Sequence, residues 1–89
     1  MNVDDDRVFN PTIYEAMREL ATRISGRYVA WQRAAETPQE AEHWRRVMYR
    51  LSAEVRAVDF DSRSAIEAKR AELRELWASL PVDAPKFED

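Results

Sequence analysis

The chain has 89 residues, 17 of them acidic and 14 basic, so its net charge is −3. This balance argues against a nucleic-acid binder that works by bulk electrostatics. The absence of cysteine excludes disulfides and thiolate metal sites. The chain has a single glycine, and 35% of its residues are charged; both features favour helices over strands and hairpins. A chain of this length is expected to form one domain over residues 1–89.

Residues 1–9 form an acidic N-terminal arm that we expect to be mobile. The arm contains Asp4, Asp5 and Asp6 and lacks the basic and apolar regions of a signal peptide. No apolar run approaches the roughly 20 residues that a membrane-spanning helix needs. Together with the absence of cysteine, these features predict a cytoplasmic protein that makes no membrane contact.

The first helix is expected over about residues 11–36. Asn10 is a favoured N-cap, and Pro11 suits the first helical position because its missing N–H would be unpaired there anyway. Apolar residues then recur at spacings of three and four, which places them on one face: Ile13, Met17, Leu20, Ile24, Tyr28, Trp31 and Ala35. Gly26 lies within this pattern. We interpret it as a small residue where a neighbouring helix crosses closely, with a hinge or kink as the alternative.

The second helix is expected over about residues 38–57. Thr37 and Glu40 form a capping box: the Thr37 hydroxyl accepts from the Glu40 amide, and the Glu40 carboxylate reaches back to the Thr37 amide. Pro38 occupies the first helical position. A heptad-like apolar seam follows, made of Ala41, Trp44, Met48, Leu51, Val55 and Val58.

The third helix is expected over about residues 62–80, with either Asp61 or Ser64 as its cap. Its apolar positions are Ile66, Leu73, Leu76, Trp77 and Leu80. Pro81 stops the helix, and residues 82–89 read as a loose tail. Connections of only a few residues make neighbouring helices antiparallel, so the pattern predicts an all-α, up-down-up three-helix bundle with short loops.

No catalytic or cofactor motif is present. The chain contains no GxxxxGK[ST], GxGxxG, HExxH or GxSxG pattern. His43 has no second histidine or cysteine to share a metal with, so we expect no metal site. Carboxylate pairs such as Glu72 and Glu75 are typical of solvated helix faces. We therefore expect no enzyme and no cofactor.

Exposed aromatic and arginine residues are the strongest sign of a function. Tyr28, Trp31, Trp44 and Trp77 lie on the apolar stripes and are expected in the core. Other aromatic residues lie off the stripes, and an exposed aromatic beside arginine is typical of a protein-interface hot spot. The candidate partner-contact residues on this basis are Phe9, Tyr14, Arg18, Arg45, Arg46 and Tyr49, each weighed against an ordinary surface residue.

The outer helix faces are also expected to carry ion pairs between residues four apart. Glu19 and Arg23 have this spacing in the first helix, and Glu42 and Arg46 have it in the second.

With three helices in this length, the chain resembles the epsilon-type antitoxins that neutralise zeta toxins. The likeness is strongest over Arg56-Ala57-Val58-Asp59-Phe60-Asp61, an aspartate-flanked aromatic turn. An amphipathic helix through Glu72-Leu73 to Trp77 follows it. Tyr14-Glu15, at the start of the first helix, sits where the family carries an aromatic-acidic stretch. The second connection is shorter than in the family, and arginine is more frequent.

The resemblance implies that the partner is a zeta-type P-loop kinase, which phosphorylates UDP-activated amino sugars, and that the first helix blocks its nucleotide site. Tyr14 would then fill an apolar part of the cleft. Glu15 or Glu19 would either occupy space meant for phosphate or pair with the basic phosphate-binding residues of the cleft. Glu19 shares a helix face with Glu15 by spacing alone. Separately from the family resemblance, we infer from its charge that the acidic arm would be drawn to such a basic cleft.

Two other functions remain open on the sequence. One is a non-catalytic interaction module, such as an adaptor or small chaperone, for a different partner. The other is a DNA-binding three-helix domain, which the net acidic charge disfavours. Arg45, Arg46, Arg50 and Arg56 do lie along the second helix, but Glu42 and Glu54 interleave them.

Overall fold

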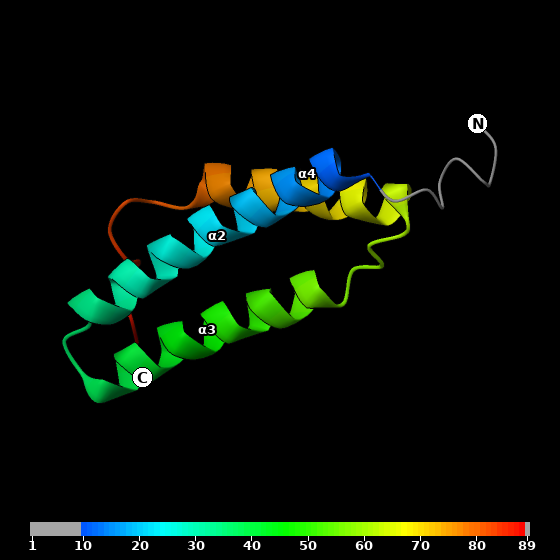
Figure 1. Cartoon of the computed structure of the whole chain (residues 1–89). Helices are drawn as coiled ribbons and strands as arrows, with labels where there is room; N and C mark the ends of the chain where they lie inside the picture. The colour runs from blue at the N-terminus through cyan, green and yellow to red at the C-terminus, as the bar shows by residue number, and fades with distance from the viewer. Residues whose placement is uncertain (1–9, 89) are drawn as a thin grey trace.

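The computed structural model describes residues 10–88 and shows an all-α three-helix bundle. The helices are α2 (Pro11–Ala34), α3 (Pro38–Arg56) and α4 (Arg63–Ser79), and each ends within one or two residues of its predicted limit. The chain reverses at each connection, so α3 runs antiparallel to both α2 and α4 (Figure 1). The predicted mobile arm, residues 1–9, lies outside the described residues.

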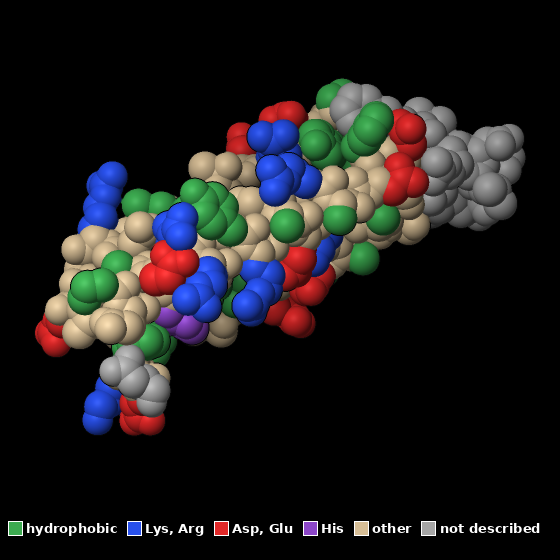
Figure 2. All heavy atoms as spheres, turned by 90° about the horizontal axis from the view of Figure 1, so that it is seen from below, with side chains coloured by type: hydrophobic (Ala, Val, Ile, Leu, Met, Phe, Trp, Pro, Cys, Tyr) green, Lys and Arg blue, Asp and Glu red, His purple; other side chains and the backbone are tan. Residues whose placement is uncertain are grey.

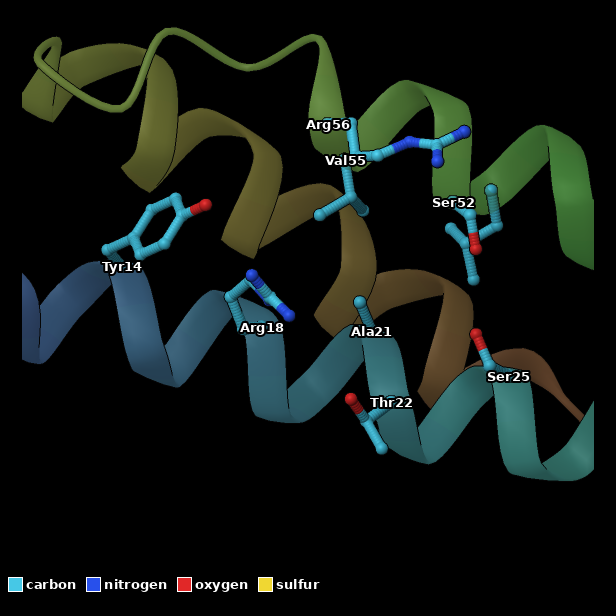
Figure 3. A pocket seen from close by; sticks show the side chains of 9 residues that line it. Tyr14, Arg18, Ala21, Thr22, Ser25, Ser52, Val55 and Arg56 are labelled. Atoms are coloured by element: carbon cyan, nitrogen blue, oxygen red, sulfur yellow. The ribbon is translucent and has the colours of Figure 1, made fainter.

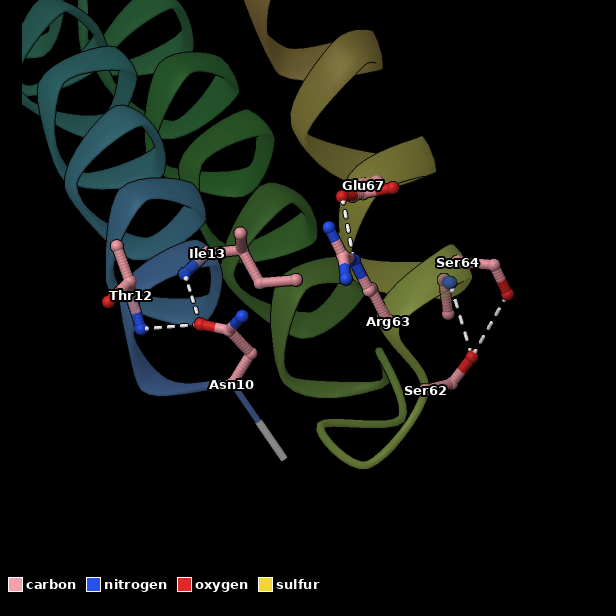
Figure 4. Close-up of polar contacts among 8 residues, drawn as sticks. Asn10, Thr12, Ile13, Ser62, Arg63, Ser64 and Glu67 are labelled. Carbon is pink, nitrogen blue, oxygen red and sulfur yellow. Dashed lines mark hydrogen bonds and ion pairs between the residues drawn. The ribbon is translucent and has the colours of Figure 1, made fainter. Parts of the chain in front are cut away.

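Local hydrogen bonds start the first two helices at the predicted residues. The Asn10 Oδ1 atom accepts from the backbone N–H groups of Thr12 and Ile13 at 3.0 and 3.3 Å (Figure 4). The Thr37 hydroxyl accepts from the Glu40 N–H at 3.1 Å, as a capping box requires. The return bond differs from the prediction, because the Glu40 carboxylate accepts from the Glu36 N–H at 3.3 Å and from the Trp44 indole at 3.2 Å.

The cap predicted for the third helix is wrong. Ser62, not Asp61 or Ser64, is the N-cap of α4, and its hydroxyl accepts from the Ala65 N–H at 3.2 Å (Figure 4). The physical reason is the turn before the helix: the Ser62 N–H donates to the Asp59 carbonyl at 3.0 Å, and the Asp61 N–H donates to the Asp59 carboxylate at 3.0 Å. Asp61 therefore belongs to the turn, and Ser62 is the last extended residue before α4.

The core lies along α2, which packs against both other helices. The predicted apolar faces are confirmed by nine buried side chains: Met17, Ile24, Tyr28 and Trp31 from α2, Trp44, Leu51 and Val55 from α3, and Ile66 and Leu73 from α4. The rings of Trp31 and Trp44 meet edge to face, with centroids 4.8 Å apart. Between α3 and α4, an ion pair joins Glu54 to Lys69 at 3.2 Å.

The interpretation of Gly26 as a close helix crossing is wrong. Gly26 is exposed, and a Cβ atom placed on it would have no heavy atom of a neighbouring residue within 4 Å. The hinge alternative finds no support either, since α2 continues unbroken through this position without a positive φ angle.

The prediction of a loose C-terminal tail is also wrong for much of the described part. After α4 ends, the Arg27 guanidinium donates to the Pro81 carbonyl at 2.6 Å, and the Trp31 indole donates to the Val82 carbonyl at 2.9 Å. Farther on, the Phe87 ring lies 5.4 Å from the His43 ring. The tail is held because Arg27 and Trp31 of α2 supply side-chain donors to the backbone carbonyls of Pro81 and Val82, just after α4 ends.

No described helix is both long and apolar enough to cross a membrane.

Candidate protein-binding surface

A groove between α2 and α3 contains two of the predicted contact residues. It has a volume of about 330 Å³ and is lined from α2 by Tyr14, Arg18, Ala21, Thr22 and Ser25, and from α3 by Leu51, Ser52, Val55 and Arg56. Tyr14 and Arg18 project from α2 toward α3, as Figure 3 shows. No acidic residue is among the described residues that line it.

Tyr14 is less exposed than predicted. It is partly buried and packs against the core, although it lies off the apolar stripe inferred from the sequence. The reason is that α2 is covered from two sides, so its buried face is wider than a single stripe. The Arg18 guanidinium lies 6.0 Å from the Tyr14 ring centroid, in a cation–π position that the spacing of four residues allows.

A second cluster on α3 holds the other predicted aromatic and arginine residues. Tyr49 is 55% exposed, and the Arg45 guanidinium lies 5.6 Å from its ring centroid. Arg45 also donates two hydrogen bonds of 2.8 Å to the Glu42 carboxylate. Arg46 is the outer member, 3.4 Å from the same carboxylate, so the expected Glu42–Arg46 pair is confirmed.

The electrostatics of this cluster follow from its hydrogen bonds. Hydrogen bonding from Arg45 is the main cause that lowers the pKa of Glu42, and its positive charge adds to the effect. The same hydrogen bond raises the pKa of Arg45. Arg45 therefore stays charged and is already paired with a carboxylate, which distinguishes it from the arginines of the groove.

Arg45 and Tyr49 do not line the groove, but they lie along the α3 edge that borders it. The successive spacings along Arg45, Tyr49, Ser52 and Arg56 are four, three and four residues, which places all four on one side of the helix. Seen from the α3 side of the molecule, basic and acidic side chains are interspersed with hydrophobic ones (Figure 2). Among the described residues, acidic side chains interrupt the basic ones on this face, so they form no continuous basic stripe of the kind that binds duplex nucleic acid.

Glu15 and Glu19 lie together on the exposed face of α2. Both line a shallow hollow that also includes Arg18, Thr22 and Arg23. Neither carboxylate forms an ion pair with another described residue, so the expected Glu19–Arg23 pair is wrong. Arg23 lies instead 5.9 Å from the ring centroid of Trp77, because that ring packs beside α2. Phe9, the remaining predicted contact residue, lies outside the described residues.

The sequence reasoning missed most of the groove. It selected aromatic residues with neighbouring arginines, and so passed over Arg56 and the small polar residues Thr22, Ser25 and Ser52. The signal that could have identified these residues is their helical spacing. Tyr14, Arg18 and Ser25 recur at four and seven residues, and the same rule connects Tyr49 to Ser52 and Arg56.

The rest of the described chain offers no group of three or more potential metal ligands. His43 contacts aromatic rings, with centroid distances of 4.5 Å to Trp44 and 5.4 Å to Phe87.

Comparison with known proteins identified no matching family model, no matching curated protein and no matching solved structure.

Proposed function

We propose that the chain is a non-catalytic, cytoplasmic inhibitor that acts as epsilon-type antitoxins do, binding a zeta-type P-loop kinase and blocking its nucleotide site with α2. The observation that carries the proposal is the pair Glu15 and Glu19. These exposed carboxylates lie one turn apart on α2 and have no ion-pair partner among the described residues. Two such carboxylates match the cationic groups of a phosphate-binding loop.

The position of the pair on the helix also supports the proposal. Both residues lie in the first half of α2 (Pro11–Ala34), whereas three of its four buried side chains, Ile24, Tyr28 and Trp31, lie in the second half. The second half is thus anchored in the core. The first half presents Glu15 and Glu19 on a face that needs no rearrangement to enter a cleft, and a preorganised surface loses less entropy on binding.

The test uses the P-loop kinase encoded next to this chain and a fluorescent ATP analogue bound to it. Adding the chain should displace the analogue, and co-expression should rescue growth of cells that produce the kinase. Glu15→Gln with Glu19→Gln should weaken displacement by roughly tenfold or more, because charge-assisted hydrogen bonds contribute about 1.5–3 kcal/mol each.

The matched control is Glu36→Gln with Glu75→Gln, which removes the same charge from two exposed carboxylates elsewhere. This variant should displace the analogue as well as the unaltered chain does. Equal weakening in the two double variants would show that overall charge, and not the α2 surface, is responsible. Binding to the kinase without displacement of the analogue would also refute the proposal and would favour an adaptor. A neighbouring gene without a GxxxxGK[ST] sequence would remove its premise.

A further inference from the structure

We propose that the α2–α3 groove is a recognition site for an extended, acidic segment of a partner protein, with carboxylates of that segment bound by Arg18 and Arg56. This site goes beyond the proposed inhibitor function. It has the opposite charge from the Glu15 and Glu19 surface, and it does not depend on the partner being a kinase.

The charge of the groove is the first argument. Arg18 and Arg56 reach it from opposite walls, and neither forms an ion pair with a described carboxylate. Arg45, by contrast, is bound by Glu42 through two hydrogen bonds. A guanidinium presents a planar fork of N–H donors that fits a carboxylate. The two groove arginines are therefore available for an incoming anion.

The shape of the groove is the second argument, because it selects an extended chain. Along α2 the lining runs from Tyr14 to Ser25, which at about 1.5 Å per residue is roughly 16 Å. An extended segment covers that distance with about five residues at roughly 3.3 Å each. The lining side chains are spread along both helices, as Figure 3 shows, so the groove is elongated and not a rounded pocket.

The remaining lining residues suit a polypeptide backbone. Thr22, Ser25 and Ser52 offer hydroxyl groups that both donate and accept hydrogen bonds, as an extended backbone requires. At the end where α2 begins, Tyr14 and Val55 offer an apolar contact for a neighbouring side chain.

The experiment is a titration of the full-length, ¹⁵N-labelled chain, followed by its amide NMR signals. The probe is an acetylated, amidated peptide of alternating aspartate and leucine, about six residues long so that it spans the groove. We expect the signals of Thr22, Ser25 and Ser52 to shift. The same peptide with asparagine in place of aspartate should bind at least about tenfold more weakly, since its amides form no ion pair with arginine.

Two matched variants locate the binding. Arg18→Gln with Arg56→Gln should weaken binding of the aspartate peptide by about tenfold or more. Arg33→Gln with Arg74→Gln removes the same charge at exposed positions outside the groove and should change binding by less than about twofold. All four substitutions are at exposed positions, and the circular dichroism of each variant checks that the helices remain.

Three results would overturn the proposal. The first is equal affinity for the aspartate and asparagine peptides. The second is equal weakening in the groove variant and the control variant. The third is that inorganic phosphate shifts the same signals with comparable affinity, which would assign the groove to free anions. None of these measurements involves the kinase. A result that refutes the groove proposal therefore leaves the proposed inhibitor function untouched.

Discussion

Replacing Arg27 with glutamine tests how firmly the C-terminal tail is attached to the bundle. Arg27 donates to the Pro81 carbonyl at 2.6 Å, and its guanidinium lies 4.6 Å from the Trp77 ring centroid. A charged hydrogen bond contributes about 1.5–3 kcal/mol and an exposed cation–π contact about 0.5–1 kcal/mol. Since the hydrogen bond is exposed to solvent, we expect no more than the sum of the two low ends, a loss of about 1–2 kcal/mol.

The assay is urea and thermal unfolding followed by circular dichroism. For a domain of this size the expected loss lowers Tm by roughly 4–16 °C. Arg74→Gln, an exposed substitution in α4, is the control and should stay within about 0.5 kcal/mol of the unaltered chain. If Arg27→Gln is no more destabilising than this control, the tail contact contributes nothing to stability and the reasoning is refuted.

A double-mutant cycle sharpens the same test. Trp31→Phe removes the indole donor to the Val82 carbonyl, the neighbouring attachment of the tail. Because Arg27 and Trp31 hold the same segment, the double variant should lose less than the sum of the two single losses, by about 0.5 kcal/mol or more. Strict additivity would mean that the two attachments are independent.

Two further predictions follow from Gly26 and from the groups that titrate in alkali. Gly26→Ala should stabilise the chain by about 0.5–1 kcal/mol, because the site is open and helical; a lower urea midpoint would contradict this. Burial, with a smaller contribution from Glu54, raises the pKa of Tyr28, and hydrogen bonding to Glu72 is the main cause that raises the pKa of Lys69. The stability from both groups is complete below their unfolded values, near 10.0 and 10.5, and is lost as pH rises through the folded pKa values. Tyr28→Phe should therefore flatten the alkaline loss of stability more than the exposed control Tyr49→Phe does, and equal slopes would contradict the burial argument.

The elements that the sequence predicted best are those governed by neighbouring residues. Asn10 and Thr37 cap helices through bonds that span two or three positions, so their roles can be read from a few letters. Helical spacing likewise identified the core residues. The start of α4 was harder, because Asp61, Ser62 and Ser64 all suit a cap, and the turn closed by Asp59 decides among them.

The candidate site depended more strongly on packing. Tyr14 and Arg18 were predicted, but Arg56 joins them only because α3 lies antiparallel against α2 and returns the end of one helix to the start of the other. Gly26 shows the converse error. A small residue in a helix is compatible with a close crossing or with open solvent, and only the position of the other helices distinguishes the two.

By itself, the sequence determined three helices, their limits and their buried faces, because capping and helical periodicity act over one or two turns. Only the tertiary structure decided which contacts form between the helices and with the tail. The tail attaches to Arg27 and Trp31 across more than fifty positions of sequence. The two groove arginines meet across the α2–α3 interface. Contacts of this kind leave no local pattern, since they arise from packing whole helices against one another.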